Sequence, residues 1–187
     1  MKFFFIECAN REAQEQIKEL SDMNFAIGSH TMTHAFLNEV EKEQAFWEIN
    51  ASKKIIEELT SKKCEWLCLP RGRGNEEIYK MIMDAGYKYI RSTKIFNLES
   101  IKLGLNHTTI HACPIRPEYE GKNWIDFFDD YLKKSVKEKG TFKFWVHYWE
   151  LEKYGIFLEF EDCLKKLKEV KDEQIADRKN KGTSVTS

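Results

Sequence analysis

Short apolar runs alternate along the chain with longer segments in which apolar residues recur every three or four positions. The short runs have the length of buried strands, and the longer segments have the period of amphipathic helices. The predicted strands cover residues 2–6, 25–28, 65–69, 87–92, 108–113 and 141–148, and the predicted helices cover residues 12–23, 43–60, 76–85, 123–139 and 161–171. Strands that alternate with helices are typical of α/β proteins with a parallel sheet.

No linker or internal repeat interrupts residues 1–171, so the pattern predicts one domain over that range. Residues 172–187 are polar and lack periodicity, which predicts a disordered tail. A chain of 187 residues is long enough to bury one sizeable core.

Composition excludes several classes of protein. Thirty basic residues against thirty-one acidic ones leave a formal charge of −1, so no overall field favours nucleic acid or an anionic membrane surface. There is no transmembrane run, and the apolar start at residues 3–6 is too short for a signal peptide, which predicts a cytoplasmic chain. The five scattered cysteines are interpreted as free thiols in a reducing compartment. They are Cys8, Cys64, Cys68, Cys113 and Cys163.

The segment Ile-Gly-Ser-His-Thr-Met-Thr-His places His30 and His34 just after the second predicted strand. Imidazoles four positions apart share one face of a helical turn or converge across a tight loop, so both can reach one divalent metal. Thr31 stands where the zincin motif needs its glutamate, so this is a different kind of site. The alternative is an exposed histidine pair without a ligand.

Two other predicted strands also end in unusual residues. Pro70, Arg71 and Gly72 follow the strand at residues 65–69, and a segment from His147 through Trp149 to Glu150 follows the last strand. In parallel α/β proteins, ligands bind at the carboxyl ends of strands. The pattern therefore predicts one functional edge built from distant parts of the chain, whereas His107 and His111 are interpreted as structural.

These motifs occur in the order found in polysaccharide deacetylases. The histidine segment resembles that family's histidine motif, Leu-Pro-Arg-Gly-Arg-Gly-Asn resembles its proline-glycine turn, Asp-Ala-Gly-Tyr resembles the end of the next helix, and Trp-Val-His resembles its late histidine strand. The resemblance extends over residues 3–168. It implies a distorted (β/α) barrel that hydrolyses N-acetyl or O-acetyl groups on a carbohydrate, such as a glycan that contains N-acetylglucosamine.

The resemblance also implies roles for individual residues. His30 and His34 would hold a divalent metal, with zinc expected, and His147 would be the general acid for the leaving amine. Candidate substrate contacts are Pro70, Arg71, Gly72 and Trp149, although Arg71 could instead be solvated and Trp149 could belong to the core. The alternative for His147 is a core histidine at a strand end.

The family's Asp-Asp motif, which supplies the catalytic base and a third metal ligand, is expected on a first strand before Phe3, and the sequence as printed does not contain it. We therefore expect the barrel to lack its first strand and catalysis to be impaired. Unpaired edges would then lie near residues 2–6 and 143–148 and would favour self-association. A preceding segment with an export signal would make the protein extracytoplasmic.

Two hypotheses from different classes follow. The first is a metal-dependent carbohydrate deacetylase, and the second is a degenerate, non-catalytic member of the same fold that binds a glycan or a protein. An unrelated zinc amidase is a third option that explains less of the ordered pattern.

Overall fold

A computed structural model describes residues 3–182. The chain divides into two compact units, one formed by residues 1–95 and 99–108 and the other by residues 96–98 and 109–187. We call them the first and the second unit and describe each by itself. The single domain predicted for residues 1–171 thus consists of two units.

The first unit contains a five-stranded sheet whose strands are all parallel and follow one another in chain order. The strands are β1 (Phe3–Ile6), β2 (Ala26–Ser29), β3 (Trp66–Cys68), β4 (Tyr89–Arg91) and β5 (Gly104–Asn106). Lys2, which was predicted to begin β1, lies outside the described residues. Because every strand runs the same way, their carboxyl ends share one edge of the sheet.

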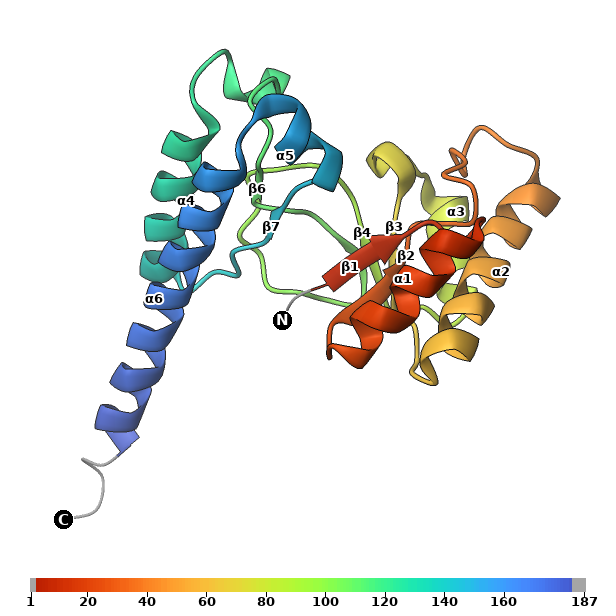
Figure 1. Cartoon of the computed structure of the whole chain (residues 1–187), viewed down its shortest axis with the longest axis horizontal. Coiled ribbons are helices and arrows are strands. Elements are labelled where there is room, and N and C mark those ends of the chain that lie inside the picture. Colours follow the sequence, from red (N-terminus) through yellow and green to blue (C-terminus); the bar gives the residue numbers. More distant parts are fainter. Residues whose placement is uncertain (1–2, 183–187) are drawn as a thin grey trace. The chain divides into compact units, whose positions relative to one another are not determined.

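Three helices pack with this sheet: α1 (Arg11–Asp22), α2 (Lys42–Thr60) and α3 (Glu76–Asp84) (Figure 1). Asn10 and Asn75 cap α1 and α3, since each side chain accepts a hydrogen bond from a backbone N–H of the first turn. Fully buried aliphatic side chains from helices and strands fill the space between them, and each contributes roughly 1.5–3 kcal/mol by its burial. They include Ile17, Ile49, Ile56, Leu67, Ile82 and Ile90.

The second unit pairs two short parallel strands, β6 (Ile110–His111) and β7 (Phe144–Trp145), and packs them with helices. The helices are α4 (Trp124–Glu138), α5 (Tyr148–Tyr154) and α6 (Phe157–Gly182). Its core is aromatic, with Phe128 fully buried against Phe142 and Phe144. An ion pair of 2.7 Å between Lys166 and Asp129 joins α6 to α4.

The structure differs from the sequence predictions at three places. The strand β5 was not predicted, and the strand predicted for residues 141–148 shrinks to β7 because Tyr148 already begins α5. Residues 172–182 were expected in a disordered tail, yet α6 continues through them to Gly182. No proline or glycine interrupts the segment between Phe157 and Gly182, and its Glu, Lys, Ala and Gln residues favour helix. Residues 183–187 lie outside the described residues.

The mixed α/β class with a parallel sheet is confirmed, but the closed barrel is not. Among the described residues, β1 pairs only with β2, and β7 only with β6. Self-association through these edges stays a prediction. No helix within residues 3–182 combines the length and the apolar character that crossing a bilayer requires.

Candidate functional site

The histidine loop, residues 30–34, begins where β2 ends at the carboxyl edge of the sheet. The His30 backbone N–H donates to the Ile6 carbonyl at 3.0 Å, which ties the start of the loop to β1. Thr31 and His34 adopt positive φ angles of 68° and 60°, so the backbone turns sharply twice. The turns bring the His30 and His34 rings to a centroid distance of 4.8 Å with planes 77° apart. The predicted convergence of this pair is therefore present.

The orientation of His30 is set by the backbone of β3. Its Nδ1 lies 2.8 Å from the Cys68 carbonyl oxygen. A carbonyl only accepts, so Nδ1 carries the proton and Nε2 keeps a lone pair. Burial lowers the pKa of His30, against the effect of this hydrogen bond, which raises it. A neutral imidazole with a fixed tautomer is the form that binds a metal.

Glu48 of α2 fixes the histidine loop by accepting hydrogen bonds from it. Its side chain is fully buried, and Oε2 accepts hydrogen bonds from the backbone N–H groups of Met32 at 2.8 Å and Thr33 at 2.9 Å. Oε1 accepts from the Thr33 hydroxyl. Three donors from two successive loop residues thus converge on one carboxylate, which offsets the cost of burying its charge.

A second buried network supports the end of β2. The Ser29 and Ser52 hydroxyls lie 2.8 Å apart, and the Thr31 N–H donates to Ser29 Oγ at 3.0 Å. Tyr87 donates to the Ile49 carbonyl at 3.0 Å, within reach of Ser52. Since these groups are buried and paired, they fix the position of α2 behind the histidine loop.

The proline-glycine turn lies after β3 in the same unit. Pro70 is buried, and Arg71 and Gly72 have positive φ angles of 50° and 70°. A Cβ at position 72 would come within 2.3 Å of the Thr93 hydroxyl oxygen, so only glycine fits there. The exposed Arg71 guanidinium lies 5.6 Å from the centroid of the Phe36 ring. The substrate-binding role of the turn stays a prediction.

His147 and Trp149 belong to the second unit, at the start of α5. His147 is the N-cap residue, and its backbone N–H donates to Glu150 Oε2 at 3.0 Å. Its Nδ1 donates to the same oxygen at 2.9 Å, which leaves Nε2 as the ring atom available for other chemistry. The Trp149 side chain is half exposed and stacks on the His147 ring at 5.6 Å.

Glu150 also accepts a hydrogen bond from His111 Nε2 at 2.7 Å. Burial opposes ionisation of Glu150, but hydrogen bonds from His111 and His147 prevail and lower the pKa of its carboxyl. Burial, helped by the nearby charge of Arg116 and opposed by the hydrogen bond to Glu150, lowers the pKa of His111 to about 4. His111 is therefore neutral at pH 7, with its proton directed at an ionised carboxylate.

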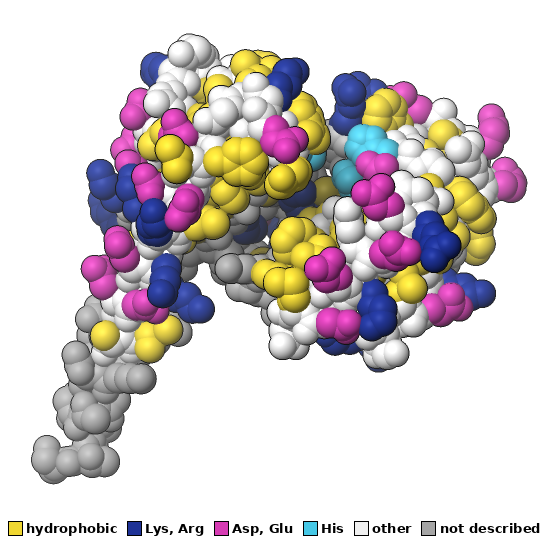
Figure 2. All heavy atoms as spheres, in the orientation of Figure 1, with side chains coloured by type: hydrophobic (Ala, Val, Ile, Leu, Met, Phe, Trp, Pro, Cys, Tyr) yellow, Lys and Arg dark blue, Asp and Glu magenta, His cyan; other side chains and the backbone are white. Residues whose placement is uncertain are grey.

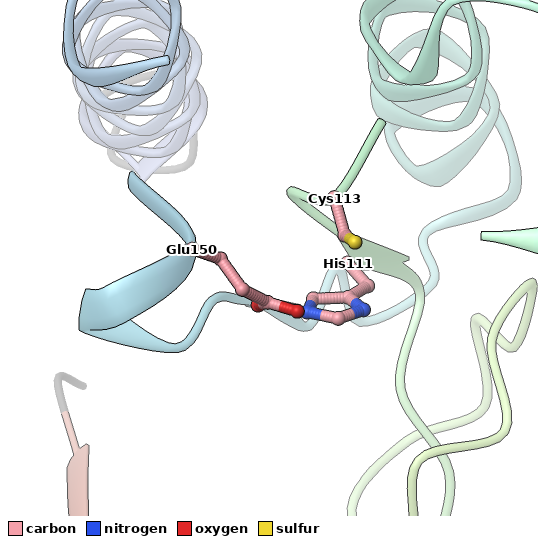
Figure 3. A group of neighbouring side chains, drawn as sticks. All are labelled: His111, Cys113 and Glu150. Atoms are coloured by element: carbon pink, nitrogen blue, oxygen red, sulfur yellow. The ribbon is translucent and has the colours of Figure 1, made fainter. Parts of the chain in front are cut away.

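The His111 ring is enclosed on several sides. It stacks face to face on Trp145 with a centroid distance of 3.6 Å, and Arg116 Nη1 donates to its Nδ1 at 3.2 Å. The Tyr119 hydroxyl binds both the carbonyl and the N–H of His111, at 2.7 and 3.1 Å. Cys113 lies beside it (Figure 3), and burial raises the pKa of the Cys113 thiol. His111 was interpreted as structural, yet it belongs to this polar cluster.

The structure brings together His30 and His34, and separately His111, His147 and Glu150 within the second unit. Figure 2 shows histidine side chains that reach the surface next to hydrophobic and acidic ones. The role of His147 toward a metal at His30 stays a prediction.

The part of the chain that contains the histidine loop is similar to known proteins. Residues 1–90 match the family model described as polysaccharide deacetylase. The resemblance to polysaccharide deacetylases is confirmed. A curated relative of this family, "Putative polysaccharide deacetylase YxkH" of Bacillus subtilis (strain 168), is 33% identical over 75 residues, which are 40% of this chain and 27% of that protein. The chain thus spans about a quarter of the length of that relative.

Two solved polysaccharide deacetylase structures are also similar. The crystal structure of a "putative polysaccharide deacetylase" from Mycobacterium smegmatis is 13% identical, covers 77% of this chain and 57% of that chain, and has a TM-score of 0.59. BC0361, a polysaccharide deacetylase from Bacillus cereus, is 24% identical over 52% of this chain and 31% of that chain, with a TM-score of 0.44. The Mycobacterium likeness supports the fold.

Proposed function

We propose that the chain provides the histidine-bearing part of a metal-dependent carbohydrate deacetylase that acts on N-acetyl or O-acetyl groups. The observation that carries this proposal is the convergence of His30 and His34 inside the segment that matches the polysaccharide deacetylase model. A glycan that contains N-acetylglucosamine is the proposed substrate, and zinc the proposed metal.

The residues present fit a metal. His30 is neutral, its Nδ1 is occupied by the Cys68 carbonyl, and its Nε2 lone pair is the donor left for a cation. The His34 ring lies in edge-on contact with the His30 ring, and His34 would be the second ligand. Catalytic zinc takes three protein ligands, so a third is needed, and the family resemblance implies an aspartate. Bound there, the metal would polarise the acetyl carbonyl as a Lewis acid.

His147 is the proposed general acid. With Nδ1–H held by the Glu150 carboxylate, a protonated His147 directs its second N–H, on Nε2, away from Glu150. That proton would pass to the sugar nitrogen as the C–N bond of the acetamide breaks, so the product leaves as a neutral amine. Glu150 is the positioning residue, because it fixes the ring and stabilises its positive charge.

The proposed substrate-binding residues would act in two ways, by direct contact with the sugar or by shaping the turn. The half-exposed ring of Trp149 and the charge of Arg71 are suited to a sugar ring and its hydroxyls. Pro70 and Gly72 act through shape, since the buried proline and the left-handed glycine form the turn that presents Arg71.

Acetate release from an N-acetylglucosamine oligomer, with added Zn²⁺, tests the proposal. We expect His30→Ala to lower the rate by at least about 100-fold, and a chelator to abolish it until Zn²⁺ is restored. His107→Gln is the matched control, because His107 is half-buried in the same unit and its bond to Ser92 can be kept by an amide. Glycan binding without acetate release, unchanged by chelator and by His30→Ala, would instead establish the non-catalytic binding protein.

A further inference from the structure

The second unit contains a compact set of three potential metal ligands. His111 ends β6, Cys113 follows two residues later, and Glu150 projects from the first turn of α5 (Figure 3). One ligand atom from each residue lies within 4.8 Å of the others. Each residue is about 4% exposed, so water does not compete freely for these atoms.

The three residues are held in place largely through backbone groups, and Glu150 Oε2 in addition accepts hydrogen bonds from His111 Nε2 and from His147. The Cys113 N–H donates to the His111 carbonyl at 2.8 Å, a tight turn that folds the cysteine back toward the imidazole. Tyr119 fixes the His111 backbone from the other side. Glu150 is fixed by the His147 N–H and belongs to a helical turn. The cluster is thus anchored through its backbone on both sides.

We propose that His111, Cys113 and Glu150 bind a zinc ion. A set of nitrogen, sulfur and oxygen ligands is typical of zinc, which needs bond lengths of about 2.0–2.3 Å and ligand atoms about 3.5 Å apart. A separation of 4.8 Å at most therefore closes by a shift of about 1 Å, which side-chain rotation supplies. The fourth position falls to water, because His147 Nδ1 donates to Glu150 Oε2 at 2.9 Å and is not available as a ligand.

Binding has a defined proton balance. The Cys113 thiol loses its proton to solvent and binds as the thiolate. The proton on His111 Nε2 is replaced by the ion, and the ring is reprotonated on Nδ1. Arg116 now donates to that nitrogen, so its guanidinium must turn toward Glu118, with which it is already paired. The positive charge of Arg116 is the feature that limits affinity.

Cobalt absorption tests the site on the full chain, with Co²⁺ alone as the probe. We expect a thiolate-to-cobalt charge-transfer band in the near ultraviolet that grows to one equivalent. Cys113→Ser should abolish it, while Cys68→Ser, the matched buried thiol beside the other histidine pair, should leave it intact. A band that survives Cys113→Ser, or no band in the wild-type chain, overturns the proposal.

Two further measurements do not depend on the stability of the cysteine variant. Zinc X-ray absorption of the zinc-loaded His30→Ala variant, in which Cys113 is intact, should show one sulfur neighbour at about 2.3 Å, and nitrogen and oxygen neighbours only would refute the site. Arg116→Gln should tighten Zn²⁺ binding by roughly tenfold through loss of a nearby positive charge, and weaker binding would refute the proposed arrangement. His30→Ala should leave the cobalt band unchanged, so failure of the deacetylase proposal and failure of this one can be distinguished.

Discussion

Each unit buries one glutamate beside its histidines, but the two carboxylates have different partners. Glu48 of the first unit accepts from two backbone N–H groups and a hydroxyl of the histidine loop. Glu150 of the second unit accepts from the imidazoles of His111 and His147 and from one backbone N–H. A buried glutamate thus fixes a loop in one unit, and another buried glutamate holds two imidazole rings in the other.

This difference determines how each site responds to its surroundings. Backbone N–H groups do not ionise in the working range of pH, so the contacts of Glu48 are permanent as long as α2 is folded. The pKa of His111 is lowered to about 4, mainly by burial, so the His111–Glu150 contact changes only in acid. The support of the first site therefore comes from groups that do not titrate, and that of the second site includes one that does.

The largest effect is expected when the brace of the first unit is removed. Glu48→Ala leaves the N–H groups of Met32 and Thr33 buried without an acceptor and should lower the free energy of unfolding by about 4 kcal/mol. Urea denaturation followed by circular dichroism measures this. Glu58→Ala, on an exposed position of the same helix, is the control and should cost under about 0.5 kcal/mol. Equal costs for both variants would refute the bracing role.

The second effect is a loss of stability on acidification, which acts on the network around Glu150. The folded pKa of His111 is lowered from its ordinary 6.5 to about 4, so between those values the unfolded chain binds a proton that the folded chain does not. Stability is therefore lost as pH falls, by about 2 kcal/mol between pH 7 and pH 5. The lowered pKa of Glu150 adds a further loss below pH 4.5, with the same sign.

Urea denaturation at pH 7 and pH 5 checks this expectation. His111→Gln removes the titrating ring and should flatten the dependence, whereas Glu48→Ala should lower stability by a similar amount at both pH values. A wild-type dependence that persists in His111→Gln would assign the acid response to other groups.

The smallest of the three effects concerns the tyrosine hydroxyls behind each site. Tyr119→Phe leaves the buried His111 N–H without its acceptor and removes one of the two donors to the His111 carbonyl, the other being the Cys113 N–H, and should cost about 2 kcal/mol. Tyr87→Phe in the first unit removes the bond to the Ile49 carbonyl and a longer contact of 3.4 Å with the Ser52 hydroxyl, and about 1 kcal/mol is expected. Thermal unfolding of the two variants under matched conditions gives the order, and the reverse order would mean that the His111 backbone finds another partner.

The sequence predicted the first unit better than the second. The helix α2 is long and periodic, and Pro70 and Gly86 mark where the next strand and the next helix end, so local signals suffice there. The convergence of His30 and His34 also follows from local spacing. Glu48 was not predicted as a support, although its place on the apolar stripe of α2, between Ala45 and Ser52, is a detectable signal.

The second unit depends on contacts between distant residues. β6 and β7 lie inside the runs predicted at residues 108–113 and 141–148, but each has only two residues, so the apolar runs overstated their length. The start of α5 was not predicted, because His147 is an unusual N-cap residue. Glu150, three positions later, nevertheless matches the capping box. The proximity of Cys113 to Glu150 has no local signal, since 37 positions of chain separate them and only the folded unit brings them together.

The brace that Glu48 provides has a consequence for recognition at His30 and His34. The loop takes its shape from a core helix, before any ligand arrives, and so the site is preorganised. A ligand that binds there does not have to order the loop, which otherwise costs about 0.5–1.5 kcal/mol for each side chain immobilised. Association should then be limited by diffusion and access to the loop, and selectivity should come from shape complementarity rather than from induced fit.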